Sequence, residues 1–266
     1  MTRLRKLAWA ALALLFVAAL FSDFLPGASY AHQFRDFPRA GVSWRFPLGT
    51  DALGRDRLAR LLVATRLSLL LAPAAALFST ILAALIGGLA GYCGGLVDRI
   101  AARAIDLMLS LPWIFLLIAA RAMLPLNVSP AASVLIVFAL LSVLGWAAPA
   151  RVIRAGVRDI RNSDFLLQSR ACGCRGMRLL LRQVVPNLRP VLLAQFFTSI
   201  PLFILAEANL GLLGLGVSEP LPSWGTLLRE LETDLAFNPG TVACLALMMA
   251  VVGCFKFLLP EGDLHS

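Results

Sequence analysis

Acidic side chains inside apolar runs are the residues of this sequence that could do chemistry. Glu207 stands in AEANLGLLGLG and Asp106 in IDLMLSLPW. An ionised side chain within a bilayer costs at least about 2.5 kcal/mol unless it finds a partner or water, so each acid is a functional candidate. We expect Glu207, with Asn209 near it, either to line a polar pathway or to form a structural or gating pair between helices. Asp106 follows Arg103 by three residues, which predicts an ion pair on one helical face.

Catalysis and nucleotide binding find no support in the sequence. It lacks the G-x-x-x-x-G-K-[ST] phosphate loop and the H-E-x-x-H zinc motif, and no nucleophile stands beside an evident base. The five cysteines, at 93, 172, 174, 244 and 254, are spread along the chain, and the two histidines lie near opposite ends. A structural metal site needs about four such ligands together, so we expect this chain to bind neither a metal nor another cofactor.

Arginines form two stripes at helical spacing. The first consists of Arg151, Arg154, Arg158 and Arg161, and the second of Arg175, Arg178 and Arg182. Residues three and four apart share one face of a helix. Such a stripe could be a solvated face that contacts lipid headgroups or a docking surface for a soluble partner, and spacing alone leaves both open. Gly173 and Gly176 are expected to loosen the start of the second helix, and Pro186 to stop it.

The composition indicates an all-α polytopic membrane protein. Of 266 residues, 59% are hydrophobic and 15% are charged, and the mean hydropathy is +0.83. Soluble domains average roughly 45–50% apolar and about 25% charged residues. The net charge of +9 comes from arginines that cluster between apolar runs, a pattern typical of cytoplasmic loops. No basic face is interleaved with aromatic residues for base stacking, so nucleic acid is not an expected partner.

Six stretches are apolar enough to be membrane-spanning helices, each of which needs roughly 20 residues. They cover about 7–25, 68–92, 100–124, 131–148, 190–215 and 241–259. The first follows the basic start MTRLRK and could be a cleaved signal. Only a weak small-residue cleavage site follows it, so we favour a retained helix.

The arginine bias predicts the orientation of these helices. With both termini in the cytoplasm, Arg99, Arg103 and the basic stretch 151–189 all fall inside, as the positive-inside rule requires. Segment 23–66, PLNVSP, and SEPLPSWGTLLRELETDLAFNPG then lie outside. Arg121 is near the outer end of the third stretch, where we expect its long side chain to snorkel to the interface.

The second basic stripe lies in a segment that resembles a family motif. Cytoplasmic loops of ABC importer permeases carry E-A-A, three residues, glycine, nine residues, then I-x-L-P. At those spacings this sequence has Leu167-Gln168-Ser169, Gly173 and Val185-Pro186, and Arg170 also follows the family. The glycine and the proline match, whereas Leu167 replaces the signature glutamate and Gln168 and Ser169 replace the alanines.

Other segments make the resemblance specific. FPLGTDALGRD, from Phe46, is similar to the P-L-G-T-D-x-x-G-R-D signature of the dipeptide, oligopeptide and nickel permeases. AEANLGLLGLGVSEPLPSWGTLLRE, from Ala206, and GYCGGLVDRIAARAIDLMLSLP, from Gly91, also follow that family. The likeness covers about residues 47–259, and the chain is identified as similar to the C-type permease subunit of these importers.

The resemblance implies a type I ABC importer permease with six transmembrane helices. Residues 1–45 would hold the first helix and an external segment, and residues 46–266 would hold the permease core with five helices. The cytoplasmic coupling loop would lie at about 150–189. Its implied ATPase-coupling residues are Leu167, Gln168, Ser169, Arg170, Gly173, Arg175, Arg178, Arg182 and Pro186.

The signature that opens the core is expected to form an external turn. Its residues are Pro47, Gly49, Thr50, Asp51, Gly54, Arg55 and Asp56. Glycine and proline favour tight turns, and Asp51 or Asp56 could cap the next helix or pair with Arg55 and Arg57. Two roles stay open, a structural turn or a contact with a substrate-delivering protein.

The segment SEPLPSWGTLLRELETD joins rigid prolines and Trp224 to an amphipathic stretch. In the family this segment lies near the outer gate and the surface that meets the binding protein. Trp224 is therefore a third candidate for the pathway or its gate, with Glu207 and Asn209. A surface re-entrant helix without a contact role is the alternative.

The implied function is that of the membrane subunit of an ATP-driven importer for peptides or nickel chelates. The implied partners are a second homologous permease, two cytoplasmic ATPases that hold ATP and Mg²⁺, an external solute-binding protein and membrane lipid. Two alternatives remain at this stage. A degenerate scaffold subunit without transport activity would fit the lost glutamate, and a membrane-embedded enzyme would use Glu207 and Asp106.

Overall fold

The computed structural model describes residues 3–21, 30–125, 128–174, 176–233 and 239–258. In these ranges the regular elements are helices, and the only β-bridge pairs Thr50 with Asp56. The all-α prediction is confirmed. The helices, with one π-helical turn η2, are α1 (Arg3–Leu20), α2 (Arg57–Cys93), α3 (Gly95–Ser110), α4 (Trp113–Ala122), α5 (Pro130–Leu144), α6 (Ala147–Arg161), α7 (Asp164–Ala171), α8 (Gly176–Leu179), η2 (Leu180–Val184), α9 (Val185–Leu212), α10 (Trp224–Thr233) and α11 (Pro239–Leu258).

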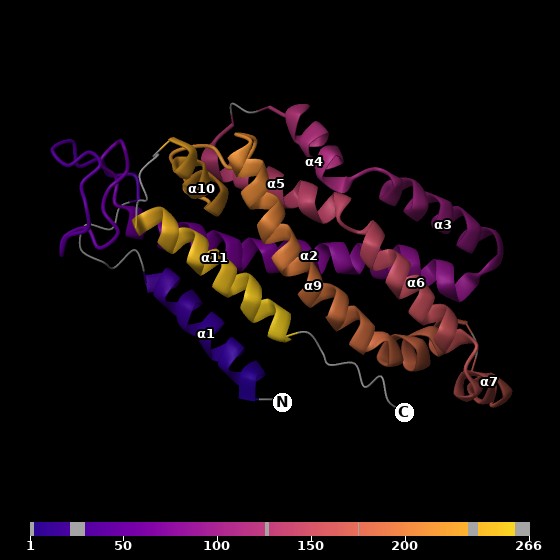
Figure 1. Ribbon diagram of the computed structural model, residues 1–266. Coiled ribbons are helices and arrows are strands. Elements are labelled where there is room, and N and C mark those ends of the chain that lie inside the picture. The colour runs from indigo at the N-terminus through magenta and orange to yellow at the C-terminus, as the bar shows by residue number, and fades with distance from the viewer. Residues whose placement is uncertain (1–2, 22–29, 126–127, 175, 234–238, 259–266) are drawn as a thin grey trace.

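The helices form an elongated bundle with two different ends (Figure 1). The α10 end carries α10 and the loops before α2, and the α7 end carries α7 and the beginning of α9. Helices α2 and α9 run between the two ends, and α1 and α11 lie side by side along the bundle (Figure 1). The Arg5 guanidinium donates a hydrogen bond to the Leu258 carbonyl at 3.3 Å, so the start of α1 lies beside the end of α11.

Three helices of the described chain are long and apolar enough to cross a membrane: 57–93, 130–161 and 182–212. The second joins α5 to α6, so the fourth predicted stretch, about 131–148, continues into the first arginine stripe. Counting α3 and α4 as one broken span gives up to four. The count of six membrane-spanning helices therefore stays a prediction.

The third predicted span is wrong as a single straight helix. Helices α3 and α4 are bent by 80° relative to each other. Leu111 adopts an extended backbone conformation between them, as is usual for a residue that precedes a proline, and Pro112 then begins α4. The polar α3 and the apolar α4 therefore point in different directions.

The helix that follows α7 also differs from the prediction. Pro186 does not stop it, because α8, η2 and α9 run on without a break from Gly176 to Leu212. The Val185 amide donates to the Leu180 carbonyl, five residues back. A proline has no N–H and its ring clashes with the carbonyl four residues earlier. The wider π turn accommodates Pro186 just after it.

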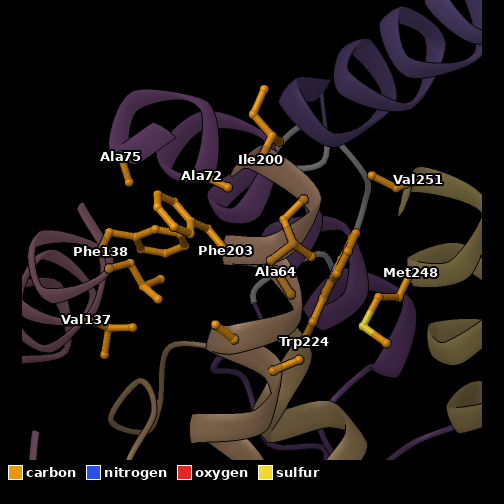
Figure 2. Packing of buried hydrophobic residues seen from close by; sticks show 14 of the residues in the cluster. Ala64, Ala72, Ala75, Val137, Phe138, Ile200, Phe203, Trp224, Met248 and Val251 are labelled. Carbon is orange, nitrogen blue, oxygen red and sulfur yellow. The ribbon is translucent and has the colours of Figure 1, made fainter. Parts of the chain in front are cut away.

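The larger of two apolar cores fills the α10 half of the bundle. It is built from α1, α2, α4, α5, α9, α10 and α11. Figure 2 shows Phe138 and Phe203 pointing toward each other next to the small residues Ala72 and Ala75 of α2. The second core lies nearer the α7 end and includes Ile105, Ile153, Leu166, Leu179 and Leu188.

Helices α2 and α6 pack in backbone contact. A Cβ atom at Gly87 would lie 2.4 Å from the Ala150 carbonyl oxygen, and one at Gly91 would lie 2.7 Å from the Arg154 carbonyl oxygen. Small residues permit such close approach in membrane helices. Because α2 starts at the α10 end and α6 stops at the α7 end, this contact joins the two ends mechanically.

Candidate functional site

The signature turn before α2 is a compact, hydrogen-bonded turn at the α10 end. The Thr50 hydroxyl donates to the Phe37 carbonyl at 2.5 Å and accepts from the Ala40 amide at 2.8 Å. Gly54 has φ +75°, and a Cβ there would lie 2.3 Å from the Phe34 carbonyl oxygen. Asp56 caps α2 by accepting from the Leu58 amide. The predicted tight turn with an aspartate cap is confirmed.

A network of ion pairs connects this turn to the segment before α10. Arg55 pairs with Asp51 and with Glu219, each at 2.5 Å. Arg60, whose side chain is 0% exposed, pairs with Glu219 at 3.2 Å and with Glu230 at 3.1 Å. The predicted pairing of Asp51 with Arg55 is confirmed. The roles of Arg60, Glu219 and Glu230 in this network were not predicted, although charged residues that flank an apolar run are a signal for such pairs.

The network also sets the protonation of its acids. Burial by itself would raise the pKa of Glu219, but the guanidinium groups of Arg60 and Arg55 outweigh burial and lower that pKa below its ordinary value. For Glu230 burial outweighs Arg60, so its pKa is raised. Glu219 therefore keeps its charge to lower pH than Glu230 does.

A polar cavity of about 680 Å³ lies beside the network. Its walls come from α4, α9 and α10, from the turn before α2, from the residues just before α5 and from the loop between α9 and α10. The charged residues that line it are Arg55, Arg121, Arg229, Glu219 and Glu230. Arg121 is 1% exposed, so the prediction that it snorkels to the interface is wrong. Its guanidinium donates to the Ser133 hydroxyl and the Pro125 carbonyl instead.

The three gate candidates occupy different environments. Glu207 is buried between α9 and the start of α10, next to the Ser223 hydroxyl and the Gly225 amide. Neither carboxylate oxygen is in hydrogen-bond geometry with any residue in the described ranges. Trp224 is buried, and its indole donates to the Thr65 hydroxyl at 3.1 Å. Asn209 is exposed, so it does not share the surroundings of Glu207.

Glycines allow the segment with Glu207 and Trp224 to pack tightly. A Cβ atom at Gly211 would lie 2.4 Å from the Gly225 Cα. One at Gly216 would lie 2.6 Å from the Gly211 Cα. The glycine-rich stretch therefore brings the end of α9, the loop after it and α10 into direct backbone contact beneath the cavity.

At the opposite end, α7 contacts the bundle through one anchored residue. Leu166 is buried in the second core, whereas Phe165, Leu167 and Gln168 are exposed. Ser169 and Arg170 are half-buried, and Gly173 ends the segment with φ +87°. In Figure 1, α7 stands apart from the long helices.

The second arginine stripe lies beside α7. Arg178 and Arg182 are exposed, and Arg175 lies outside the described residues. The Tyr92 hydroxyl, at the end of α2, donates to the Gly176 carbonyl at 2.9 Å. This bond holds the start of α8 against α2.

Two of the four arginines in the first stripe form ion pairs with α3. Arg154 forms two hydrogen bonds with the Asp98 carboxylate, at 2.5 Å and 2.8 Å. Arg151 pairs with Asp106 at 2.5 Å. The predicted pair of Asp106 with Arg103 is therefore wrong, because the bend at Pro112 lays α3 against α6. Arg158 stays exposed.

Comparison with known proteins decides the family. The family model described as "Binding-protein-dependent transport system inner membrane component" matches residues 83–259. The chain belongs to this family. It is 33% identical over 231 residues to the dipeptide transport system permease protein DppC of Bacillus subtilis, covering 85% of this chain and 69% of that one.

Further relatives give the same result. The di/tripeptide transport system permease protein DppC of Pseudomonas aeruginosa is 37% identical over 223 residues, covering 82% of this chain and 72% of that one. The oligopeptide transport system permease protein OppC of Haemophilus influenzae is 29% identical over 211 residues, covering 79% and 66%. The chain thus spans about two thirds of the length of these permeases.

Family membership makes this chain a membrane permease of a binding-protein-dependent transport system. The membrane-embedded enzyme and the inactive scaffold are not favoured. The matched range begins inside α2 and ends after α11, so it includes α7, α10 and every residue that lines the cavity except Arg55.

Proposed function

We propose that this chain is one of two homologous permease subunits of an ATP-driven importer for peptides. The α10 end would face the exterior and receive solute from a binding protein. The α7 end would face the cytoplasm, together with both termini, and contact two ATPase subunits. Those subunits would bind ATP and Mg²⁺, because this sequence has no phosphate loop of its own.

The observation that carries this proposal is the isolation of α7. A helix anchored by Leu166 alone, with Phe165 and Leu167 exposed, presents apolar surface away from its own core. Exposed apolar surface next to polar residues is typical of a docking site. The resemblance of this segment to the coupling motif of ABC importer permeases supports an ATPase contact here. An exposed leucine in place of the usual glutamate suits a partner groove that is apolar at that point.

The packing of α6 supports a mechanical role for α7. Only Asn162 and Ser163 separate the two helices, and α6 is in backbone contact with α2 at Gly87. A displacement of α7 by ATPase closure would move α6 and α2 as one body. Rigid-body movement of helices around a central site is a common basis of alternating access.

Peptides are proposed as the solute because the relatives are named as dipeptide, di/tripeptide and oligopeptide permeases. The cavity at the α10 end contains both cationic and anionic side chains. A zwitterionic solute with one free amine and one free carboxylate would find both charges there.

Transport in reconstituted vesicles tests the proposal. The two permeases, the ATPases and the binding protein would be combined in proteoliposomes with labelled trialanine outside. Uptake should require ATP inside and should be lost when this chain alone is omitted. ATP-dependent uptake of the same rate without this chain would contradict the proposal.

The arginines beside α7 are proposed to assist ATPase docking. Arg178 and Arg182 are exposed next to α7, and Arg175 precedes them in the sequence. Reversal of all three charges should weaken assembly with the ATPases and slow uptake. The matched control reverses Arg35, which is exposed at the α10 end. Intact assembly and uptake in the triple variant would show that these arginines serve another purpose.

A further inference from the structure

Arg121 is a buried cation without a described counter-ion. Its side chain belongs to α4, is 1% exposed and lines the cavity at the α10 end. In the part of the chain that the structure describes, its hydrogen-bond acceptors are the neutral Ser133 hydroxyl and Pro125 carbonyl. Its Nε is buried without an acceptor. A buried charge costs several kcal/mol unless a partner offsets it. An anion bound next to Arg121 would remove this cost.

The Ser133 hydroxyl fixes the position of Arg121. It accepts hydrogen bonds from the Arg121 guanidinium at 3.3 Å and from the Ser218 amide at 3.2 Å, and it donates to the Gly216 carbonyl at 3.3 Å. One hydroxyl thus holds α4, α5 and the loop after α9 together. With all three of its bonds made, Ser133 has nothing left to offer as an additional partner for the charge.

The other charges around the cavity do not neutralise Arg121. Glu219 is held by Arg55 and Arg60, and Glu230 is held by Arg60. Arg229 is a further cation on the wall, and its guanidinium lies against Gly214. The charged residues of the lining are three arginines and two glutamates, which leaves one positive charge in excess.

From these contacts we infer that the cavity at the α10 end is a carboxylate-binding site in which Arg121, assisted by Arg229, takes the C-terminal carboxylate of a peptide. The inference rests on the proposed import of peptides and specifies where one end of the solute binds. Arginine presents a planar set of N–H donors that match a carboxylate. The volume of about 680 Å³ lies within the range of ligand sites, roughly 300–1,000 Å³.

Equilibrium binding to the complete transporter tests the inference. The complex of both permeases and both ATPases would be placed in nanodiscs of phosphatidylcholine, without binding protein or nucleotide. Labelled trialanine would be the probe, with trialanine amide, acetate and inorganic phosphate as competitors. Trialanine should bind, acetate should displace it, and the amide should bind at least about tenfold more weakly, because a hydrogen bond to a charged group is lost.

Variants of the arginines locate the site. Arg121→Gln should weaken trialanine binding about tenfold and leave the weak binding of trialanine amide unchanged. Arg121→Lys should retain part of the affinity, and Arg229→Gln should give a smaller loss. The control Arg103→Gln removes an exposed arginine of α3 and should have no effect. If Arg121→Gln fails to assemble, two measurements still test the site. One compares the affinities of the unaltered complex for trialanine and trialanine amide, and the other is the affinity of Arg229→Gln for trialanine.

Several results would overturn the inference. Equal affinity for trialanine and its amide would do so, as would an equal loss of both in Arg121→Gln, which would indicate a structural role only. Displacement by phosphate but not by acetate would indicate a site for a lipid phosphate instead. Absence of binding by both trialanine and acetate would also reject it, whether or not uptake is observed.

The same preparation separates this inference from the proposed function. ATP-dependent trialanine uptake with binding protein added tests the function directly. Uptake without carboxylate-dependent binding would leave the importer intact and reject the site. Carboxylate-dependent binding without any uptake would support the site and reject the proposed import function.

Discussion

The two ends of the bundle use arginine in opposite ways. At the α10 end, Arg55 and Arg60 are buried and hold three carboxylates. At the α7 end, Arg178 and Arg182 are exposed. The arginine chemistry is the same, and only the surroundings differ. One set is held in ion pairs inside the fold, and the other is available to contact lipid or protein.

This contrast separates residues that support structure from residues that are available for function. A buried ion pair contributes little net stability, but removing one partner leaves an uncompensated charge. An exposed arginine contributes almost nothing to folding. Substitutions at the two ends should therefore fail in different assays, the first in stability and the second in assembly with partners.

The largest expected effect is that of Arg60→Met. The substitution removes a fully buried cation and leaves the partly buried Glu230 and the half-exposed Glu219 with fewer partners, which should destabilise the permease by about 3–5 kcal/mol. The measurement is thermal unfolding of the purified complex, followed by fluorescence-detected size exclusion. Arg178→Met, at an exposed position, should change stability by less than about 0.5 kcal/mol. Equal losses in the two variants would refute the contrast.

The next effect is that of Gly87→Val at the contact that joins the two ends. Its Cβ would meet the Ala150 carbonyl oxygen at 2.4 Å, whereas nothing lies within 4 Å of a Cβ at Gly88. Overpacking should cost about 1–3 kcal/mol and reduce the uptake obtained per ATP hydrolysed. Gly88→Val is the matched control, because it makes the same change of residue one position along the same helix. Similar coupling in both variants would show that the α2–α6 contact does not transmit movement.

A smaller effect is expected from Leu167→Ala on α7. Leu167 is 52% exposed, so about half of a full leucine burial, roughly 1 kcal/mol, is available to a partner. The ATPases should bind about fivefold more weakly in a pull-down titration, while the stability of the permease alone stays unchanged. Leu107→Ala, on an exposed leucine of α3, serves as the control. Unchanged ATPase affinity would exclude an apolar contact at Leu167.

The smallest effect is the pH dependence of Glu219→Gln. Burial would raise the pKa of Glu219, but Arg60 and Arg55 lower it below the ordinary value of 4.5. Its contribution to stability is therefore complete above pH 4.5 and is lost as pH falls through the lowered pKa. Glu219 is 52% exposed, so the difference between the variants at pH 7 should be less than about 1 kcal/mol. Thermal unfolding of both proteins between pH 7 and pH 3 measures it, with Asp36→Asn as the control. A difference that persists at the lowest pH would show that the charge of Glu219 is not responsible.

Several features were predictable from local sequence. The apolar runs gave most of the helices, and the turn residues before α2 predicted the Asp56 cap and the pair of Asp51 with Arg55. Two errors arose at prolines: Pro112 breaks the third stretch, and Pro186 is accommodated by a π turn. A third arose from a contact across the fold, because Arg151 of α6 pairs with Asp106 in place of Arg103.

The sequence by itself determined that the chain belongs in a membrane, that it is helical and which family it resembles. Hydropathy, periodicity and motif spacing are properties of the chain read in order. Tertiary structure alone decided which charges became buried. Arg121, expected at the membrane interface, instead lies beside a cavity because Ser133 and the glycine-rich loop close over it. Burial depends on residues distant in sequence that fold onto the same place, and no local pattern encodes that.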